Sequence, residues 1–147
     1  MSGHAELAQV WPRDGALRLV GRLHDHEPEP ATAAAWTLRL TPRGAAGERA
    51  LCYPAPLDGM AFDASLPVAD LVPEGPFEPP ALWDVWLAPP EDSGAGLRVG
   101  RLLDDIRGKK KIMVFPGQQV TRGDLTMLVR PYYTIKENLS VEVLPGR

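Results

Sequence analysis

Apolar and polar residues alternate along most of the chain. Between positions 17 and 23, Leu17, Leu19 and Leu23 are separated by arginines, valine and glycine. Because successive side chains of a β-strand point to opposite faces, this spacing predicts a strand with one buried face. We predict further short strands over residues 5–11, 36–40, 51–53, 60–66, 82–87, 97–101, 125–129 and 139–143.

Proline and glycine separate these stretches. The chain has 16 prolines and 14 glycines, which is typical of short strands joined by turns. The Asp-Gly pair at 14–15 predicts a hairpin turn. Residues 68–71 can form one helical turn between prolines. Residues 98–107 have apolar residues at helical spacing, but Gly100 and Gly108 favour a strand and a turn.

The pattern predicts one all-β domain over residues 1–147. Its expected form is an antiparallel, immunoglobulin-like β-sandwich of roughly eight to ten short strands with little or no helix. Strands do not alternate with helices, which argues against a parallel doubly wound sheet. We interpret the proline-rich stretch 73–80 as a crossover between two sheets.

Charge and composition narrow the range of partners. The net charge of -3 argues against a nucleic-acid-binding protein, which would usually be basic. No stretch approaches the ~18 apolar residues of a membrane span, and the N-terminus does not resemble a signal peptide. The single cysteine allows no internal disulfide, so a cytoplasmic protein is expected. The abundance of Ala, Arg, Gly and Pro indicates an actinobacterial genome.

No pattern of catalytic or metal-binding residues emerges. The chain has no Gly-x-Ser-x-Gly elbow, and its three histidines all precede residue 27. Cys52 lies between apolar residues, which favours a buried, inert thiol. The His-Asp-His stretch at 24–26 offers fewer ligands than a zinc site needs. We therefore predict no catalytic residue, no metal and no cofactor.

Two groups of residues are candidates for binding. The run 107–111 holds the densest positive charge and could contact a phosphate of a nucleotide-sugar, a lipid head group or an anionic wall polymer. The same run also fits a solvated turn that protects a strand edge. Tryptophans and the tyrosine pair at 132–133 could stack on sugar rings, although core packing is the commoner role. The predicted binding residues are Arg101, Arg107, Lys109, Lys110, Lys111, Trp86 and Tyr133.

The C-terminal half resembles a known family. The segments LWDVWLAP, LRVGRLLDDIR and VRPYYTIKENLSVEV resemble an accessory domain of actinobacterial glycosyltransferases and teichoic-acid-type glycerophosphotransferases. The resemblance implies an immunoglobulin-like sandwich that works beside a transferase and carries no catalytic residues. The matching residues are Trp83, Asp84, Val85, Gly100, Arg101, Pro131, Tyr132, Thr134, Asn138, Leu139 and Ser140.

Two classes of function follow from the sequence. The first is a non-catalytic module that binds a transferase partner protein or a glycopolymer of the cell envelope. The second is a small transferase or hydrolase with an unrecognised site, which turnover by the purified chain would reveal. Exposed strand edges also allow a homodimer.

Overall fold

The computed structural model describes residues 4–24, 30–43, 50–72, 81–90, 96–101, 116–122, 124–134 and 138–145. Eleven strands and two short 3-10 helices occur within these ranges, and no α-helix does. The prediction of an all-β chain with little helix is confirmed. In the same ranges, no helix is long and apolar enough to cross a membrane.

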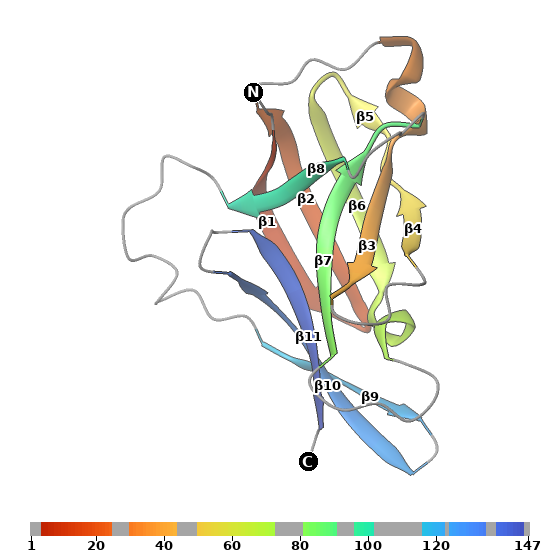
Figure 1. Ribbon diagram of the computed structural model, residues 1–147, viewed down its shortest axis with the longest axis vertical. Coiled ribbons are helices and arrows are strands. Elements are labelled where there is room, and N and C mark those ends of the chain that lie inside the picture. The colour runs from red at the N-terminus through yellow and green to blue at the C-terminus, as the bar shows by residue number, and fades with distance from the viewer. Residues whose placement is uncertain are drawn as a thin grey trace.

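The elements follow one another along the chain as short segments (Figure 1). Their bounds are β1 (His4–Arg13), β2 (Ala16–His24), η1 (Pro30–Ala35), β3 (Thr37–Pro42), β4 (Leu51–Pro54), β5 (Leu57–Asp58), β6 (Ala61–Pro67), η2 (Val68–Leu71), β7 (Ala81–Ala88), β8 (Leu97–Arg101), β9 (Gln118–Arg122), β10 (Leu125–Tyr133) and β11 (Leu139–Pro145).

Hydrogen bonding joins the strands into one mixed sheet. The order is β5-β6-β2-β1-β8-β7-β11-β10-β9, and β3 also pairs with β7 and with β4. The pairs are antiparallel except β1 and β8, which run parallel, with Ala5 opposite Val99. The sheet is therefore not wholly antiparallel. β8 pairs with β1 in parallel on one side and with β7 in antiparallel on the other.

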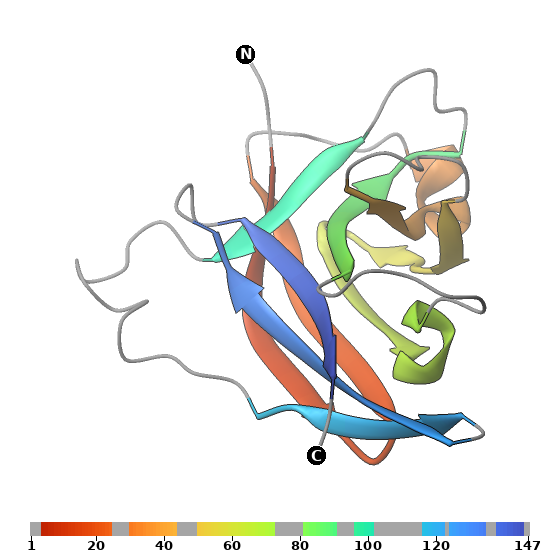
Figure 2. The same cartoon turned by 60° about the horizontal axis from the view of Figure 1, so that its bottom comes forward.

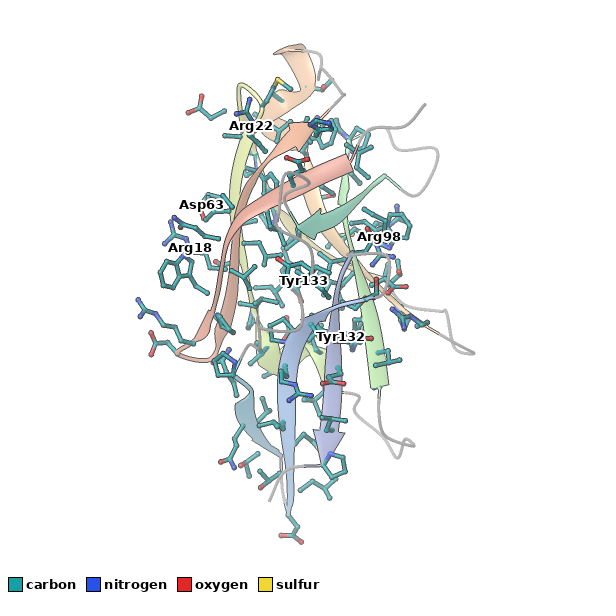
Figure 3. All side chains as sticks on the ribbon, turned by 90° about the vertical axis from the view of Figure 1, so that its left-hand side faces the viewer. Arg18, Arg22, Asp63, Arg98, Tyr132 and Tyr133 are labelled. Atoms are coloured by element: carbon teal, nitrogen blue, oxygen red, sulfur yellow. The ribbon has the colours of Figure 1, made fainter. Side chains whose placement is uncertain are left out.

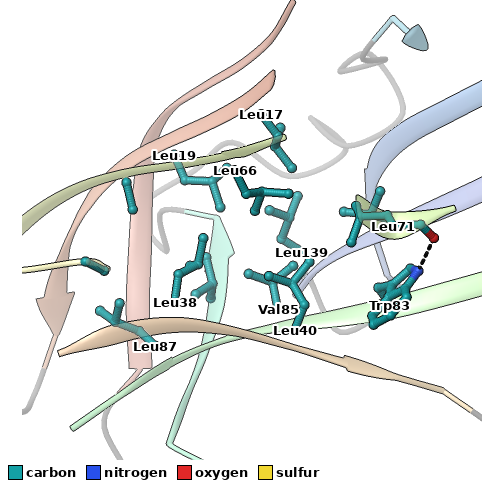
Figure 4. Packing of buried hydrophobic residues seen from close by; sticks show 14 of the residues in the cluster. Leu17, Leu19, Leu38, Leu40, Leu66, Leu71, Trp83, Val85, Leu87 and Leu139 are labelled. Carbon is teal, nitrogen blue, oxygen red and sulfur yellow. Dashed lines mark hydrogen bonds between the residues drawn. The ribbon is translucent and has the colours of Figure 1, made fainter. Parts of the chain in front are cut away.

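The sheet bends at β8, so two layers face each other (Figures 1 and 2). One layer contains β1, β2, β5 and β6, and the other contains β3, β4, β7, β9, β10 and β11. The core lies between the layers, where leucines of β2 and β6 meet leucines and valines of β3, β7 and β11 (Figure 4). At one end of the core, the Trp83 indole nitrogen donates to the Leu71 carbonyl at 3.0 Å.

Alternation predicted which residues share a face of a strand. In β7, Trp83, Val85 and Leu87 are buried, whereas Asp84 and Trp86 are half-buried on the other side. The single helical turn predicted at 68–71 is η2. Residues 97–101 are a strand as favoured, while residues 102–107 and the predicted crossover 73–80 lie outside the described ranges.

Three local expectations were wrong. The polar, proline-bearing stretch 24–34 predicts a loop, but residues 30–35 form η1. Pro131 predicts that the strand beginning at Leu125 is broken or bent after Val129, but β10 continues through Pro131 to Tyr133. The described pairing with β9 ends at Val129, so the missing N–H of Pro131 faces no ladder partner there. Cys52 is exposed because it points outward from β4.

One side chain ties the two layers together at the β1–β2 turn. The Gln118 amide accepts a hydrogen bond from the Gly15 N–H at 2.7 Å and donates to the Ala16 carbonyl at 2.8 Å. Gln118 belongs to β9, which sequence reasoning missed because its residues are mostly polar. The contact holds the hairpin of one layer against the edge of the other.

Candidate functional site

A row of polar side chains crosses the outward face of the second layer. Register places Thr41 opposite Asp84, Asp84 opposite Ser140, and Ser140 opposite Tyr132, on β3, β7, β11 and β10 in turn. Directly opposed side chains on neighbouring strands lie about 5 Å apart, so these four groups are within reach of their neighbours. We call this face the arginine face, because its other prominent members are Arg43 and Arg98.

Asp84 is the centre of the arginine face. Arg43 donates to its two carboxylate oxygens at 2.5 and 3.4 Å, and the Ser140 hydroxyl donates at 2.9 Å. Arg98 lies 3.6 Å from the same carboxylate. Arg43 is held there because its backbone N–H donates to the Leu82 carbonyl and extends the pairing of β3 with β7.

These contacts shift the pKa values of the charged groups. Burial alone would raise the pKa of Asp84, but hydrogen bonds from Arg43 and Ser140 and the nearby positive charges outweigh it and lower the pKa. The pKa of Arg43 is raised, chiefly by its hydrogen bond to Asp84 and also by Tyr132. Both groups are therefore charged throughout the neutral range.

Arg98 occupies a different environment from Arg43. Its guanidinium lies 5.1 Å from the ring centre of Trp86, a cation–π contact. It donates to the Leu139 carbonyl at 3.1 Å, while its buried Nε has no hydrogen-bond partner within the described ranges. Desolvation lowers the pKa of Arg98. Trp86 is fixed in turn, because its indole nitrogen donates to the Thr41 hydroxyl at 3.0 Å.

The face carries a surplus of positive charge. Arg43 and Arg98 bring two positive charges to the single carboxylate of Asp84. Further along the sheet, Arg130 and Glu142 face each other on β10 and β11 and neutralise each other through hydrogen bonds. An anion approaching the Asp84 region would therefore meet donors that are already positioned and incompletely neutralised.

The structure places only part of the predicted binding set. Trp86 lies in the arginine face, whereas Tyr133 packs against the core on the opposite side of β10 from Tyr132. Arg98, Tyr132 and Tyr133 are labelled in Figure 3, which is turned by 90° from the view of Figure 1. The backbone of Arg101 pairs with Leu7 at the end of β8. Its side chain and all of Arg107, Lys109, Lys110 and Lys111 lie outside what the structure describes.

Metal-binding groups are not assembled in the part of the chain that the structure describes, where no three His, Cys, Asp or Glu side chains gather. His24 lies 3.5 Å from the buried Glu6 carboxylate. His26 falls outside the described ranges, so the pairing of the two histidines stays untested.

The geometry defines an all-β module with a polar, arginine-bearing outer face. No family model matches the chain, and no curated protein sequence matches it significantly. Among solved structures, a crystal structure of S. aureus TarS 217–571 matches with a TM-score of 0.69, 13% identity, and coverage of 100% of this chain and 40% of that chain. S. aureus TarS also matches with a TM-score of 0.68 and 13% identity, over 97% of this chain and 25% of that chain.

These matches concern the fold. The chain spans between a quarter and two-fifths of the TarS chains, so it corresponds to one part of a larger polypeptide there.

Proposed function

We propose that this chain is a non-catalytic binding module of a bacterial cell-envelope glycosyl- or glycerophosphotransferase system. The observation that carries the proposal is the fold match over essentially the whole chain to part of TarS, a teichoic-acid glycosyltransferase. An immunoglobulin-like arrangement of the two layers, an actinobacterial source, a cytoplasmic location and dimerisation through strand edges belong to the same proposal.

The proposed ligand is a phosphate-bearing glycopolymer, bound at the arginine face. A guanidinium suits phosphate because its N–H donors match two phosphate oxygens. Arg98 supports this role, since Arg98 and Arg43 share the single carboxylate of Asp84 and so leave a surplus positive charge. Trp86 beneath the guanidinium keeps it oriented. In sequence, the basic run 107–111 follows β8 and would add charge for the same polymer.

Asp84 supports binding rather than acid–base catalysis. A general base acts best with a pKa near the working pH, but the pKa of Asp84 is lowered. Its oxygens already accept hydrogen bonds from Arg43 and Ser140. In this proposal the carboxylate orients the arginines and does not exchange protons with a substrate.

Calorimetric titration with poly(glycerol phosphate) tests this assignment. The wild-type chain should bind, and Arg98→Ala should weaken binding by at least about tenfold, because hydrogen bonds to charged groups contribute ~1.5–3 kcal/mol. Arg18→Ala is the matched control, since Arg18 lies in the other layer and is paired with Asp63. Equal affinity of wild type and Arg98→Ala would contradict the assignment.

A turnover assay separates this proposal from the enzyme alternative. The purified chain should release no product from nucleotide-sugars or CDP-glycerol in the presence of the polymer. Sustained turnover that is lost in Asp84→Asn would replace the binding proposal with a catalytic one.

A further inference from the structure

The outward face of the first layer carries a different set of side chains. Trp11 is 40% exposed and lies opposite Arg18 on the neighbouring strand, which in turn lies opposite Ser65. In the next row, Gln9 is opposite Val20 and Val20 is opposite Asp63. We call this face, formed by β1, β2 and β6, the tryptophan face.

The Trp11 ring is exposed but held in place. Its indole nitrogen donates to the Gln9 side-chain oxygen at 3.0 Å, and the Arg13 guanidinium lies 5.4 Å from its ring centre. Trp11 and Leu125 are the large hydrophobic residues exposed in the described ranges, and Leu125 lies on another strand, β10. An exposed, oriented indole offers a flat apolar surface with a polar edge.

A hydrogen-bonding pair stands beside this ring. Arg18 donates to both oxygens of Asp63, at 2.9 and 2.6 Å. Both side chains are about half exposed, at 53% and 51%. The carboxylate keeps free lone pairs and the guanidinium keeps further N–H groups. The pair therefore presents donors and acceptors side by side without net charge.

A shallow depression of about 240 Å³ continues the face beyond Val20. Small residues on neighbouring strands, Ala8 and Ala61 among them, leave this space. Gly21 also lines it, at a point where a Cβ atom would lie 2.1 Å from the Glu6 carbonyl oxygen, so β1 approaches β2 closely there. The polar members of the lining are Arg22 and Asp58, which again have opposite charges.

We propose that the tryptophan face binds a neutral saccharide. One pyranose ring would stack on Trp11, its hydroxyls would bond to Arg18 and Asp63, and the next ring would follow Val20 into the depression. A neutral ligand rich in hydroxyls fits because the face combines an apolar platform with balanced donors and acceptors. An anion would find the Arg18 guanidinium already paired with the Asp63 carboxylate.

This site stands apart from the arginine face. Figure 3 shows Arg18 and Asp63 on one side of the molecule and Arg98 on the other, with the core between them. The ligand class also differs, so loss of one site would leave the other intact. The inference goes beyond the proposed function and does not depend on it.

Titration of the full chain with three neutral probes tests the inference: cellohexaose, chitohexaose and maltohexaose. Tryptophan fluorescence and calorimetry should show saturable binding of at least one probe. Trp11→Ala should abolish it, and Asp63→Asn should weaken it. Leu125→Ala is the matched control, because it removes the other large hydrophobic side chain that is exposed within the described ranges.

Trp11→Phe keeps the measurement informative about the platform itself. The smaller aromatic ring should restore part of the binding that Trp11→Ala loses. If Trp11→Ala lost binding only because it folds poorly, the affinity would not depend on the size of the ring at position 11. The inference is overturned if none of the three probes binds saturably. It is also overturned if Trp11→Ala binds like the wild type. Arg98→Ala should bind the neutral probe normally, so failure here is distinguishable from failure of the proposed function.

Discussion

The two outward faces of this molecule use the same Arg–Asp pairing in opposite ways. On the arginine face, the Asp84 side chain is only 18% exposed and is shared by Arg43, Arg98 and Ser140. On the tryptophan face, Asp63 is 51% exposed and has Arg18 as its partner in the described contacts. Burial makes the first pair part of the fold, whereas solvent screens the second and leaves it available to a ligand.

The largest expected effect is on Asp84. Asp84→Ala leaves two arginines and a buried hydroxyl without their shared acceptor, so the free energy of unfolding should fall by roughly 2–3 kcal/mol. Asp63→Ala is the matched control and should unfold at nearly the wild-type urea concentration. The contrast between the faces fails if urea denaturation shows that the two variants lose equal stability.

Gly21 should be the next most sensitive position. Gly21→Ala places a methyl group against the Glu6 carbonyl and the Phe62 ring, so β1 must shift, at a cost of roughly 1–3 kcal/mol. Gly59→Ala is the control, because its φ of +67° is strained for alanine although nothing lies within 4 Å of the new Cβ. Calorimetry should show a lower unfolding temperature for Gly21→Ala than for Gly59→Ala. The reverse order would mean that β1 does not approach β2 this closely.

A smaller loss is expected at Gln118. Gln118→Ala removes two hydrogen bonds to the β1–β2 turn, and each contributes on the order of 1 kcal/mol at most in this partly exposed setting. Amide exchange should accelerate at Gly15, while the centre of β7 should stay protected. Unchanged exchange at Gly15 would show that the turn holds its place without the second layer.

The pH dependence provides a further contrast between the faces. The folded-state pKa of Asp84 is lowered from its ordinary value of 3.8. The ionised carboxylate therefore stabilises the fold fully when the pH is well above 3.8. This stability should be lost as the pH falls through 3.8 toward the lower folded-state value. Asp84→Asn should flatten this acid loss in urea titrations more than Asp63→Asn does. Equal flattening would mean that the shared, more buried Asp84 contributes no more to acid stability than the exposed Asp63 does.

The sequence predicted the strands because, in a strand with one buried face, every second residue is apolar. It placed Trp83 and Trp86 on opposite faces of one strand, and the structure shows that Trp83 is the buried one. The arginine face could not be found this way, since Asp84 and Ser140 are 56 residues apart and meet only through register. Arg43 lay just beyond the predicted strand, and its position depends on a backbone bond to β7.

The tryptophan face was hidden for a related reason. Trp11 is one of four tryptophans, and nothing in its neighbours distinguishes it from the buried Trp36. Its exposure follows from the irregular pairing of β1 with β2 between Leu7 and Gln9, where Ala8 is the extra residue. An irregularity of one residue reverses the faces of a strand and leaves no clear sequence signal.

A crossed titration tests the central claim most directly. Wild type, Arg98→Ala and Trp11→Ala would each be titrated with poly(glycerol phosphate) and with the neutral hexasaccharide that the wild type binds best. We expect Arg98→Ala to lose affinity for the anionic polymer alone and Trp11→Ala to lose affinity for the neutral saccharide alone. If either variant loses both ligands, or neither variant loses any, two separate binding faces do not exist.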